Sequence, residues 1–316
     1  MAGIKKLKGG FKLFVTEDEK LIATSNSRNT VYVYDADTKK LVLQTKTVSN
    51  VSKKAISSDK KYLAAKNTGG LIALISMETG EELFRNKMEE REGYPMTFTS
   101  DNEHVLDLDW NGNTMLLDCT DNTCKVLDRQ EDPRSLPRVS YMHFDRYSNL
   151  IYKFVADEWG NSKGVVMASK ADPENINFKI VQKFPDVLPD DIRGGISFCK
   201  EHNYYVDRKN KQIIMCDKQF KELKRIAIPE EAYQNDAYYI SLLWASPNEN
   251  YYFILTKEKL DRNFMSINSP VSYLVKADTL ETVQKFDYEY VSDFTMIHDD
   301  TEFIIATWQG SFMGKI

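Results

Sequence analysis

The chain alternates between short apolar runs and polar turns along almost its whole length. The stretch VYVYDADTKKLVLQT at 31–45 contains two alternating runs joined by a polar turn, and LIALISMETGEELFR at 71–85 repeats that layout. Alternation with a period of two residues, bounded by turn-forming residues, predicts β-hairpins. No segment shows a helical period over ten residues. The pattern therefore predicts an all-β protein.

The hairpins belong to a longer repeat. Equivalent turn positions precede a short apolar strand at Asp18, Asp59, Asp101, Tyr147, Glu201, Asn248 and Asp300. Their successive spacings are 41, 42, 46, 54, 47 and 52 residues. A four-stranded sheet cannot bury both of its faces alone, and stacking neighbouring repeats covers them. Seven such units predict a seven-bladed β-propeller.

The repeat also predicts the domain organisation. One propeller domain is expected over 1–316, with blades at about 11–47, 51–87, 94–129, 139–184, 194–228, 239–287 and 291–316. The last unit supplies three strands only, so the strand at 4–9 is expected to complete it. That pairing would close the ring and remove an exposed sheet edge, which invites aggregation.

Two segments carry a family resemblance, namely TEDEKLIATSNSRNTVYVYDADTKKLVL at 16–43 and SSDKKYLAAKNTGGLIALISMETGEELF at 57–84. In both, an aspartate turn leads into an apolar strand, a polar turn and a second strand. The chain resembles the WD40 and YVTN-type repeat propellers over its length. It lacks the Gly-His pair and the Trp-Asp dipeptide of WD40 repeats, so the hydrogen-bonded tetrad of those blades is not expected.

The resemblance implies which connections share a face. With strands a to d in each blade, the d–a and b–c connections open on one face. The long connections lie there, at 86–95, 128–140, 155–164, 185–195, 229–240 and 256–270. Long loops on a rigid scaffold commonly carry binding residues. This face is therefore the predicted binding face, and its mixed charge suits another protein or peptide as the partner.

Aromatic residues make the prediction specific. Trp110, Trp159 and Trp308 each stand where strand b gives way to the b–c turn. Tryptophan is enriched at interface hot spots, although such rings could instead fill the gap between adjacent blades. The other candidates on this face are Tyr233, Tyr238, Tyr239, Phe264, Arg193, Glu158 and Asp236.

Composition narrows the function classes. Hydrophobic residues make up 42 % of the 316-residue chain, enough for a packed core. A net charge of −5 argues against nucleic-acid binding, and the lack of an 18-residue apolar run argues against a membrane span. A cytoplasmic location is expected, because the start lacks a signal-peptide pattern, although a signal removed before residue 1 would leave no trace. Cys119 and Cys124 flank a turn, where reduced thiols are favoured over a cross-strand disulfide.

Enzyme motifs are missing. The sequence contains no HExxH, GxSxG, P-loop or GxGxxG, and its four histidines do not cluster. No metal and no cofactor are therefore expected. The resemblance to YVTN-type propellers includes lactonases, so a small-molecule hydrolase at the channel mouth is the alternative. Glu158, Arg193 and Asp236 have the residue types that it would need. The favoured function is a non-catalytic protein-interaction or scaffold module.

Overall fold

The structure is a computed structural model, and every regular element in its described part is a β-strand. It describes residues 3–87, 96–108, 113–128, 138–145, 147–148, 150–156, 162–169, 179–182, 196–207, 210–228, 238–258 and 271–316. Within these ranges, no helix is long and apolar enough to cross a membrane. The chain divides into two compact units, Lys12–Val187 and Met1–Phe11 with Leu188–Ile316. We call them the first and the second unit.

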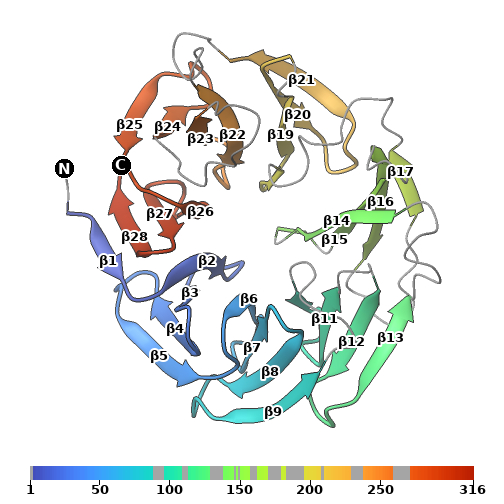
Figure 1. The fold of residues 1–316 in the computed structure, drawn as a ribbon. Coiled ribbons are helices and arrows are strands. Elements are labelled where there is room, and N and C mark those ends of the chain that lie inside the picture. Colours follow the sequence, from blue (N-terminus) through green and yellow to red (C-terminus); the bar gives the residue numbers. More distant parts are fainter. Residues whose placement is uncertain are drawn as a thin grey trace. The chain divides into compact units, whose positions relative to one another are not determined.

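In its described residues, the first unit contains four antiparallel sheets, each of four strands in sequence order (Figure 1). The first of them, sheet 1, begins at the boundary between the two units. Sheet 1 consists of β2 (Gly10–Val15), β3 (Leu21–Ser25), β4 (Thr30–Asp35) and β5 (Leu41–Lys46). Sheet 2 consists of β6 (Val51–Ile56), β7 (Tyr62–Asn67), β8 (Leu71–Ser76) and β9 (Glu82–Lys87). Sheet 3 consists of β10 (Thr97–Phe98), β11 (His104–Leu108), β12 (Thr114–Asp118) and β13 (Cys124–Asp128). Sheet 4 consists of β14 (Arg138–Phe144), β15 (Leu150–Ala156), β16 (Ser162–Ser169) and β17 (Lys179–Gln182).

The second unit contains three such sheets, and the last one includes the N-terminal strand. Sheet 5 consists of β18 (Ser197–Phe198), β19 (Asn203–Asp207), β20 (Gln212–Cys216) and β21 (Glu222–Ala227). Sheet 6 consists of β22 (Tyr238–Ala245), β23 (Tyr251–Glu258), β24 (Ser272–Lys276) and β25 (Thr282–Phe286). Sheet 7 consists of β26 (Val291–Ile297), β27 (Glu302–Thr307), β28 (Gly310–Lys315) and β1 (Lys5–Leu7).

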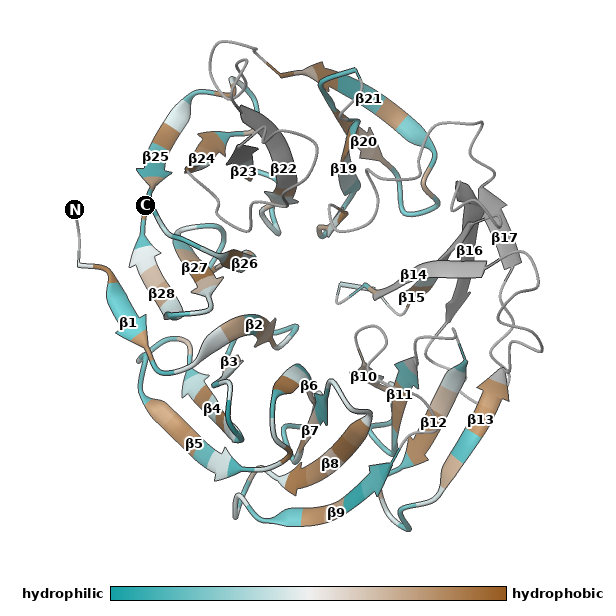
Figure 2. Cartoon of the chain, in the orientation of Figure 1, coloured by the Kyte–Doolittle hydropathy of each residue, from teal (hydrophilic) through white to brown (hydrophobic). Residues whose placement is uncertain are grey.

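Apolar side chains on the two middle strands hold neighbouring sheets together. Residues 72–75 of β8 are fully buried, and Figure 2 shows β8 brown over most of its length, whereas the outer strand β9 is largely hydrophilic. Val33 of sheet 1 packs in one apolar cluster with Leu63 and Ile75 of sheet 2. In the second unit, Phe253 stacks on Phe294 of the next sheet at a centroid distance of 4.2 Å. Burying both faces of each sheet supplies the main stabilisation.

The predicted pairing of the N-terminal strand with the last sheet is present. β1 runs antiparallel to β28, with Lys5 opposite Met313 and Leu7 opposite Ser311. Leu7 is buried, whereas Lys5 is exposed. Ile4 packs against the apolar cluster of sheets 6 and 7. The strand therefore covers the edge of β28, and the closure of the sheets into one ring stays a prediction.

A contact between a–b turns links successive sheets within each unit. One residue of the a–b turn lies in the left-handed region, with φ between 61° and 64°, and its side chain contacts the preceding a–b turn. The four pairs are Lys60 with Asp18, Asn102 with Ser58, Glu249 with His202, and Asp300 with Ser246. The period of the sequence locates these turns, but the contact between them is visible only in the structure.

Glu249 makes the most extensive of these contacts. Its Oε1 accepts the backbone N–H of His202 at 2.8 Å, and its Oε2 lies 2.8 Å from His202 Nδ1 and accepts the Tyr204 hydroxyl at 2.5 Å. Burial opposes ionisation, but the hydrogen bonds from Tyr204 and His202 outweigh it and lower the pKa of Glu249. A carboxyl whose pKa is lower in the folded state stabilises the fold above its unfolded pKa of about 4.3. That stabilisation is lost as the pH falls through the folded value.

We therefore expect Glu249→Gln to lower the free energy of unfolding by about 1.5–3 kcal/mol at pH 7, as for hydrogen bonds to a charged group. The difference from the wild type should narrow as the pH falls below the unfolded pKa of about 4.3 and toward the lowered pKa of the folded state. Urea unfolding at a series of pH values measures both quantities. Glu289→Gln, an exposed carboxyl on the same unit, is the control and should follow the wild type. A gap that stays constant with pH would contradict this role for Glu249.

Candidate functional site

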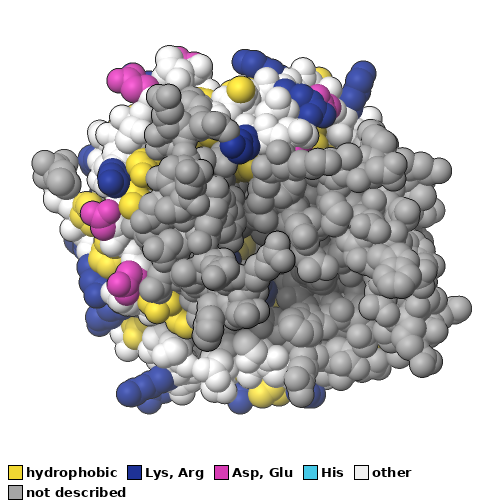
Figure 3. All heavy atoms as spheres, turned by 45° about the horizontal axis from the view of Figure 1, so that its top comes forward, with side chains coloured by type: hydrophobic (Ala, Val, Ile, Leu, Met, Phe, Trp, Pro, Cys, Tyr) yellow, Lys and Arg dark blue, Asp and Glu magenta, His cyan; other side chains and the backbone are white. Residues whose placement is uncertain are grey.

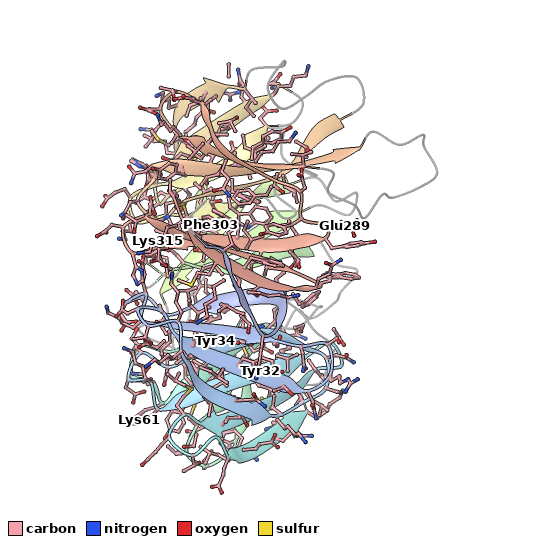
Figure 4. The ribbon with its side chains drawn as sticks, turned by 90° about the vertical axis from the view of Figure 1, so that its left-hand side faces the viewer. Tyr32, Tyr34, Lys61, Glu289, Phe303 and Lys315 are labelled. Atoms are coloured by element: carbon pink, nitrogen blue, oxygen red, sulfur yellow. The ribbon has the colours of Figure 1, made fainter. Side chains whose placement is uncertain are left out.

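The candidate site lies at the end of sheet 7 that bears its b–c turn and its d–a connection. We call this the upper end of the sheet. The b–c turn contains Trp308 and Gln309, and the connection from β25 to β26 comprises 287–290. Figure 4 shows Glu289 at this end of sheet 7 and Lys315 at the opposite end.

Trp308 is the one predicted binding residue whose side chain the structure describes. Tyr238 and Tyr239 are the first two residues of β22 and not part of a loop, and only their backbone is described. The remaining candidates lie outside the described residues: Trp110, Trp159, Tyr233, Phe264, Arg193, Glu158 and Asp236. The hydrolase alternative, which needs three of these, therefore stays a prediction from the sequence.

Trp308 is exposed and belongs to an aromatic cluster. Its side chain is 61 % exposed, and it is the only aromatic residue among the exposed large hydrophobic residues in the described ranges. Its ring stacks on Tyr290 at a centroid distance of 5.5 Å with planes 16° apart. Phe11 lies 6.2 Å away in a tilted contact. We call Phe11, Tyr290 and Trp308 the aromatic platform. A ring exposed to this extent does not fill a gap between sheets.

The b–c turn that carries Trp308 is held by close backbone packing. The Thr307 hydroxyl donates to the Gly310 carbonyl at 3.0 Å and accepts the Gln309 N–H at 3.0 Å. A Cβ atom on Gly10 would lie 2.1 Å from the Thr307 carbonyl oxygen, so only glycine fits. Gly310 has φ 146°, and a Cβ atom there would lie 2.8 Å from Cε of Lys6. The turn therefore packs closely against Lys6 of β1 and Gly10 at the start of β2.

Two members of the platform have an unfavourable backbone conformation. Phe11 has φ 71° and Tyr290 has φ 55°, in the left-handed region that bulky residues rarely adopt. The Ser292 hydroxyl donates to the Phe11 carbonyl and helps to hold this conformation. Such strain costs about 1–3 kcal/mol per residue and is concentrated at functional sites. Positive φ also occurs at Phe220 and Leu280 in c–d turns, so backbone strain alone does not distinguish the platform.

Two carboxylates adjoin the platform in sequence. Asp287 and Glu289 are exposed, and within the described part of the chain neither has a hydrogen-bond or ion-pair partner. Tyr288 between them points elsewhere, because its ring stacks on Phe312 at 4.3 Å. Burial raises the pKa of Tyr288, so this phenol stays neutral at physiological pH. The upper end of sheet 7 thus combines exposed aromatic surface with uncommitted negative charge.

Phe11 and Tyr290 are binding candidates that the sequence analysis missed. Tyr290 lies in a short connection, whereas the search was directed at long ones. Phe11 lies in a strand, and its only signal is the preceding Gly9-Gly10 pair, which indicates a tight backbone approach. Of the three platform residues, the sequence indicated Trp308 alone, because it repeats a position seen in two other repeats of the sequence.

The described residues offer little catalytic chemistry. One group with metal-ligand atoms occurs there, formed by Asp101, Glu103 and His104 at the a–b turn of sheet 3. Its Asp101 carboxylate already accepts the Thr99 hydroxyl and the Glu103 N–H. His104 Nε2 lies 3.5 Å from Asp118. These contacts explain the group as turn structure.

Two of the buried thiols are not activated either. Cys119 is buried and Cys124 is exposed, and neither forms a disulfide. Burial raises the pKa of the Cys119 thiol to about 12, and it does the same for Cys216. A thiol with such a pKa is not a nucleophile at neutral pH.

Comparisons with known proteins identify the fold. No protein-family model and no curated protein matches the sequence. The crystal structure of the Cps50 (Swd1) β-propeller domain of Myceliophteria thermophila is similar, with a TM-score of 0.66 and 10 % identity over 99 % of this chain and 100 % of that one. The structure of U3-55K is similar as well, with a TM-score of 0.64 and 13 % identity over 99 % of this chain and 98 % of that one. With its four-stranded antiparallel sheets, the chain therefore has an all-β, β-propeller fold.

Proposed function

We propose that this chain is a non-catalytic interaction module that binds another protein through the upper ends of its sheets. The observation that carries the proposal is the exposed and immobilised ring of Trp308. A large ring that is already ordered loses little side-chain entropy on binding, so most of its buried area contributes to affinity. Trp and Tyr are the residue types most enriched at interface hot spots.

The surrounding surface supports a protein partner over a polyanion. Figure 3 shows basic and acidic side chains interspersed over the described surface. The formal net charge of −5 also disfavours a phosphate backbone. An exposed aromatic ring on a surface that carries charges of both signs is consistent with a protein interface, which has an apolar core and a polar rim.

Partner capture with variants tests the proposal. Proteins that bind the immobilised full chain are identified, and each is then compared on the wild type, Trp308→Ala and Leu223→Ala. Leu223 is an exposed apolar residue on the outer strand β21 of the same unit, so it is a matched control. We expect Trp308→Ala to weaken the binding of a specific partner by about 2 kcal/mol, or roughly thirtyfold in affinity, as at a hot spot. Unchanged affinity with intact folding would reject the upper end of sheet 7 as the binding surface.

A further inference from the structure

We propose that the aromatic platform and the carboxylates of Asp287 and Glu289 receive a cationic side chain, arginine above all, from an extended segment of the partner. This inference rests on the proposed function and specifies the chemistry of its ligand. It is drawn from the open face of Trp308 and from the uncommitted carboxylates that precede Tyr290.

The geometry leaves one face of the Trp308 ring available. Tyr290 covers the other face in a near-parallel stack, with planes 16° apart. Phe11 adds a tilted contact at a centroid distance of 6.2 Å, with its plane at 54° to that of Trp308. A ring that remains 61 % exposed in these contacts presents its second face to solvent. A planar guanidinium can lie flat on such a face, and Trp is the best aromatic partner for a cation.

Charge decides which ligand suits this face. Asp287 and Glu289 are exposed in the connection that ends at Tyr290, and Figure 4 shows the Glu289 side chain pointing away from sheet 7. An apolar ligand would take water from these carboxylates and give them no partner, which is unfavourable. An anionic ligand would be repelled. The guanidinium combines both properties, because it can stack on an indole ring and can also donate hydrogen bonds to carboxylates.

The same unit already contains intramolecular examples of this contact. Lys6 Nζ lies 5.6 Å from the centroid of Phe312, which is the ring stacked on Tyr288. Lys285 Nζ lies 5.9 Å from the centroid of Tyr273. Two aromatic rings of the second unit thus each have a lysine over them. For the open face of Trp308, the described residues provide no such cation.

A direct test uses a short arginine peptide and its neutral isostere. Acetyl-Gly-Arg-Gly-amide and its citrulline counterpart are titrated into the full chain, and the indole N–H resonance of Trp308 is followed by NMR. Trp308→Phe identifies that resonance. We expect the arginine peptide to bind about tenfold more tightly than the citrulline peptide, with affinity falling as salt is raised. Equal shifts with both peptides, or a Trp308 resonance that does not move, would overturn the inference.

Variants test the role of the carboxylates. The double variant Asp287→Asn with Glu289→Gln should lower the affinity for the arginine peptide about fivefold. The effect is modest because both charges are exposed and partly screened. Asp278→Asn is the matched control, since Asp278 is an exposed carboxylate of the same unit in the c–d turn of sheet 6. Equal weakening by the control, or none by the double variant, would contradict a specific site.

These experiments distinguish a failure of this inference from a failure of the proposed function. A partner whose capture depends on Trp308, while the arginine peptide does not bind, would remove the cationic ligand and leave the interaction module. Partner capture that is unchanged in Trp308→Ala would reject the proposed function itself. The variants change exposed side chains, and near-ultraviolet circular dichroism verifies that they fold as the wild type does.

Discussion

Replacing Asp107 by leucine is expected to lower the free energy of unfolding by about 3–5 kcal/mol, the cost of leaving a buried charge without its partner. Asp107 Oδ2 lies 2.6 Å from Nζ of Lys66, and both side chains are fully buried. Lys66 is on β7 of sheet 2, and Asp107 is on β11 of sheet 3, so the pair links two sheets of the first unit. Urea unfolding monitored by circular dichroism measures the loss.

A double variant distinguishes the stability lost with the ion pair from the stability lost by changing the shape of the side chain. Lys66→Met with Asp107→Leu removes both charges and should recover most of the lost stability, because two apolar side chains need no desolvation of a charge. Lys61→Met is the control, since Lys61 forms an exposed pair with Asp59 at 3.1 Å on the same sheet. It should change stability by less than about 0.5 kcal/mol. A single Asp107→Leu variant as stable as this control would contradict the buried pair.

The strands were predictable because the turns that separate them follow a local rule. Asp59 accepts the Ser57 hydroxyl at 2.7 Å and the Lys61 N–H at 3.1 Å, and Asp18 bonds Thr16 and Lys20 in the same way. These contacts join residues only two positions apart. A side chain that hydrogen-bonds its own turn marks that turn in the sequence. The period of the fold could therefore be read from single residues.

The buried ion pair was not predictable, for a physical reason. Lys66 follows the apolar run of β7, where the alternation of the strand allows a solvent-exposed position. Its partner Asp107 lies 41 residues further along the chain, on another sheet. Lysine is almost never fully buried unless it is paired. Without the partner in view, the sequence favours an exposed lysine.

The aromatic platform was only partly predictable because its members come from distant segments. Trp308 repeats a position found in other repeats of the sequence, and this repetition identified it as a candidate. Phe11 precedes Tyr290 by 279 positions, and it contacts Trp308 because the N-terminal segment packs on sheet 7. The pairing of β1 with β28 was predicted. Its consequence for Phe11 requires coordinates, since a positive φ at phenylalanine has no sequence signal.

Truncating Leu7 to alanine is expected to cost about 2–5 kcal/mol of stability, as for other buried leucines. Leu7 is 3 % exposed and lies on a strand of three residues, so one side chain provides much of the contact between β1 and the rest of sheet 7. Lys5→Ala is the matched control on the same strand, because Lys5 is exposed and should change stability by less than about 0.5 kcal/mol. Thermal and urea unfolding of the three proteins provide the measurement.

Deleting residues 1–9 should cost more than Leu7→Ala does. The deletion also removes Ile4 from the apolar cluster of sheets 6 and 7 and the backbone hydrogen bonds between β1 and β28. It leaves β28 as an uncovered edge, whose free N–H and C=O groups can pair with another chain, so aggregation should rise with protein concentration. Light scattering of the truncated and full chains measures this. A truncated chain that keeps the stability and solubility of the full chain would show that β1 is dispensable. The N-terminal strand would then have no structural role in completing the last sheet.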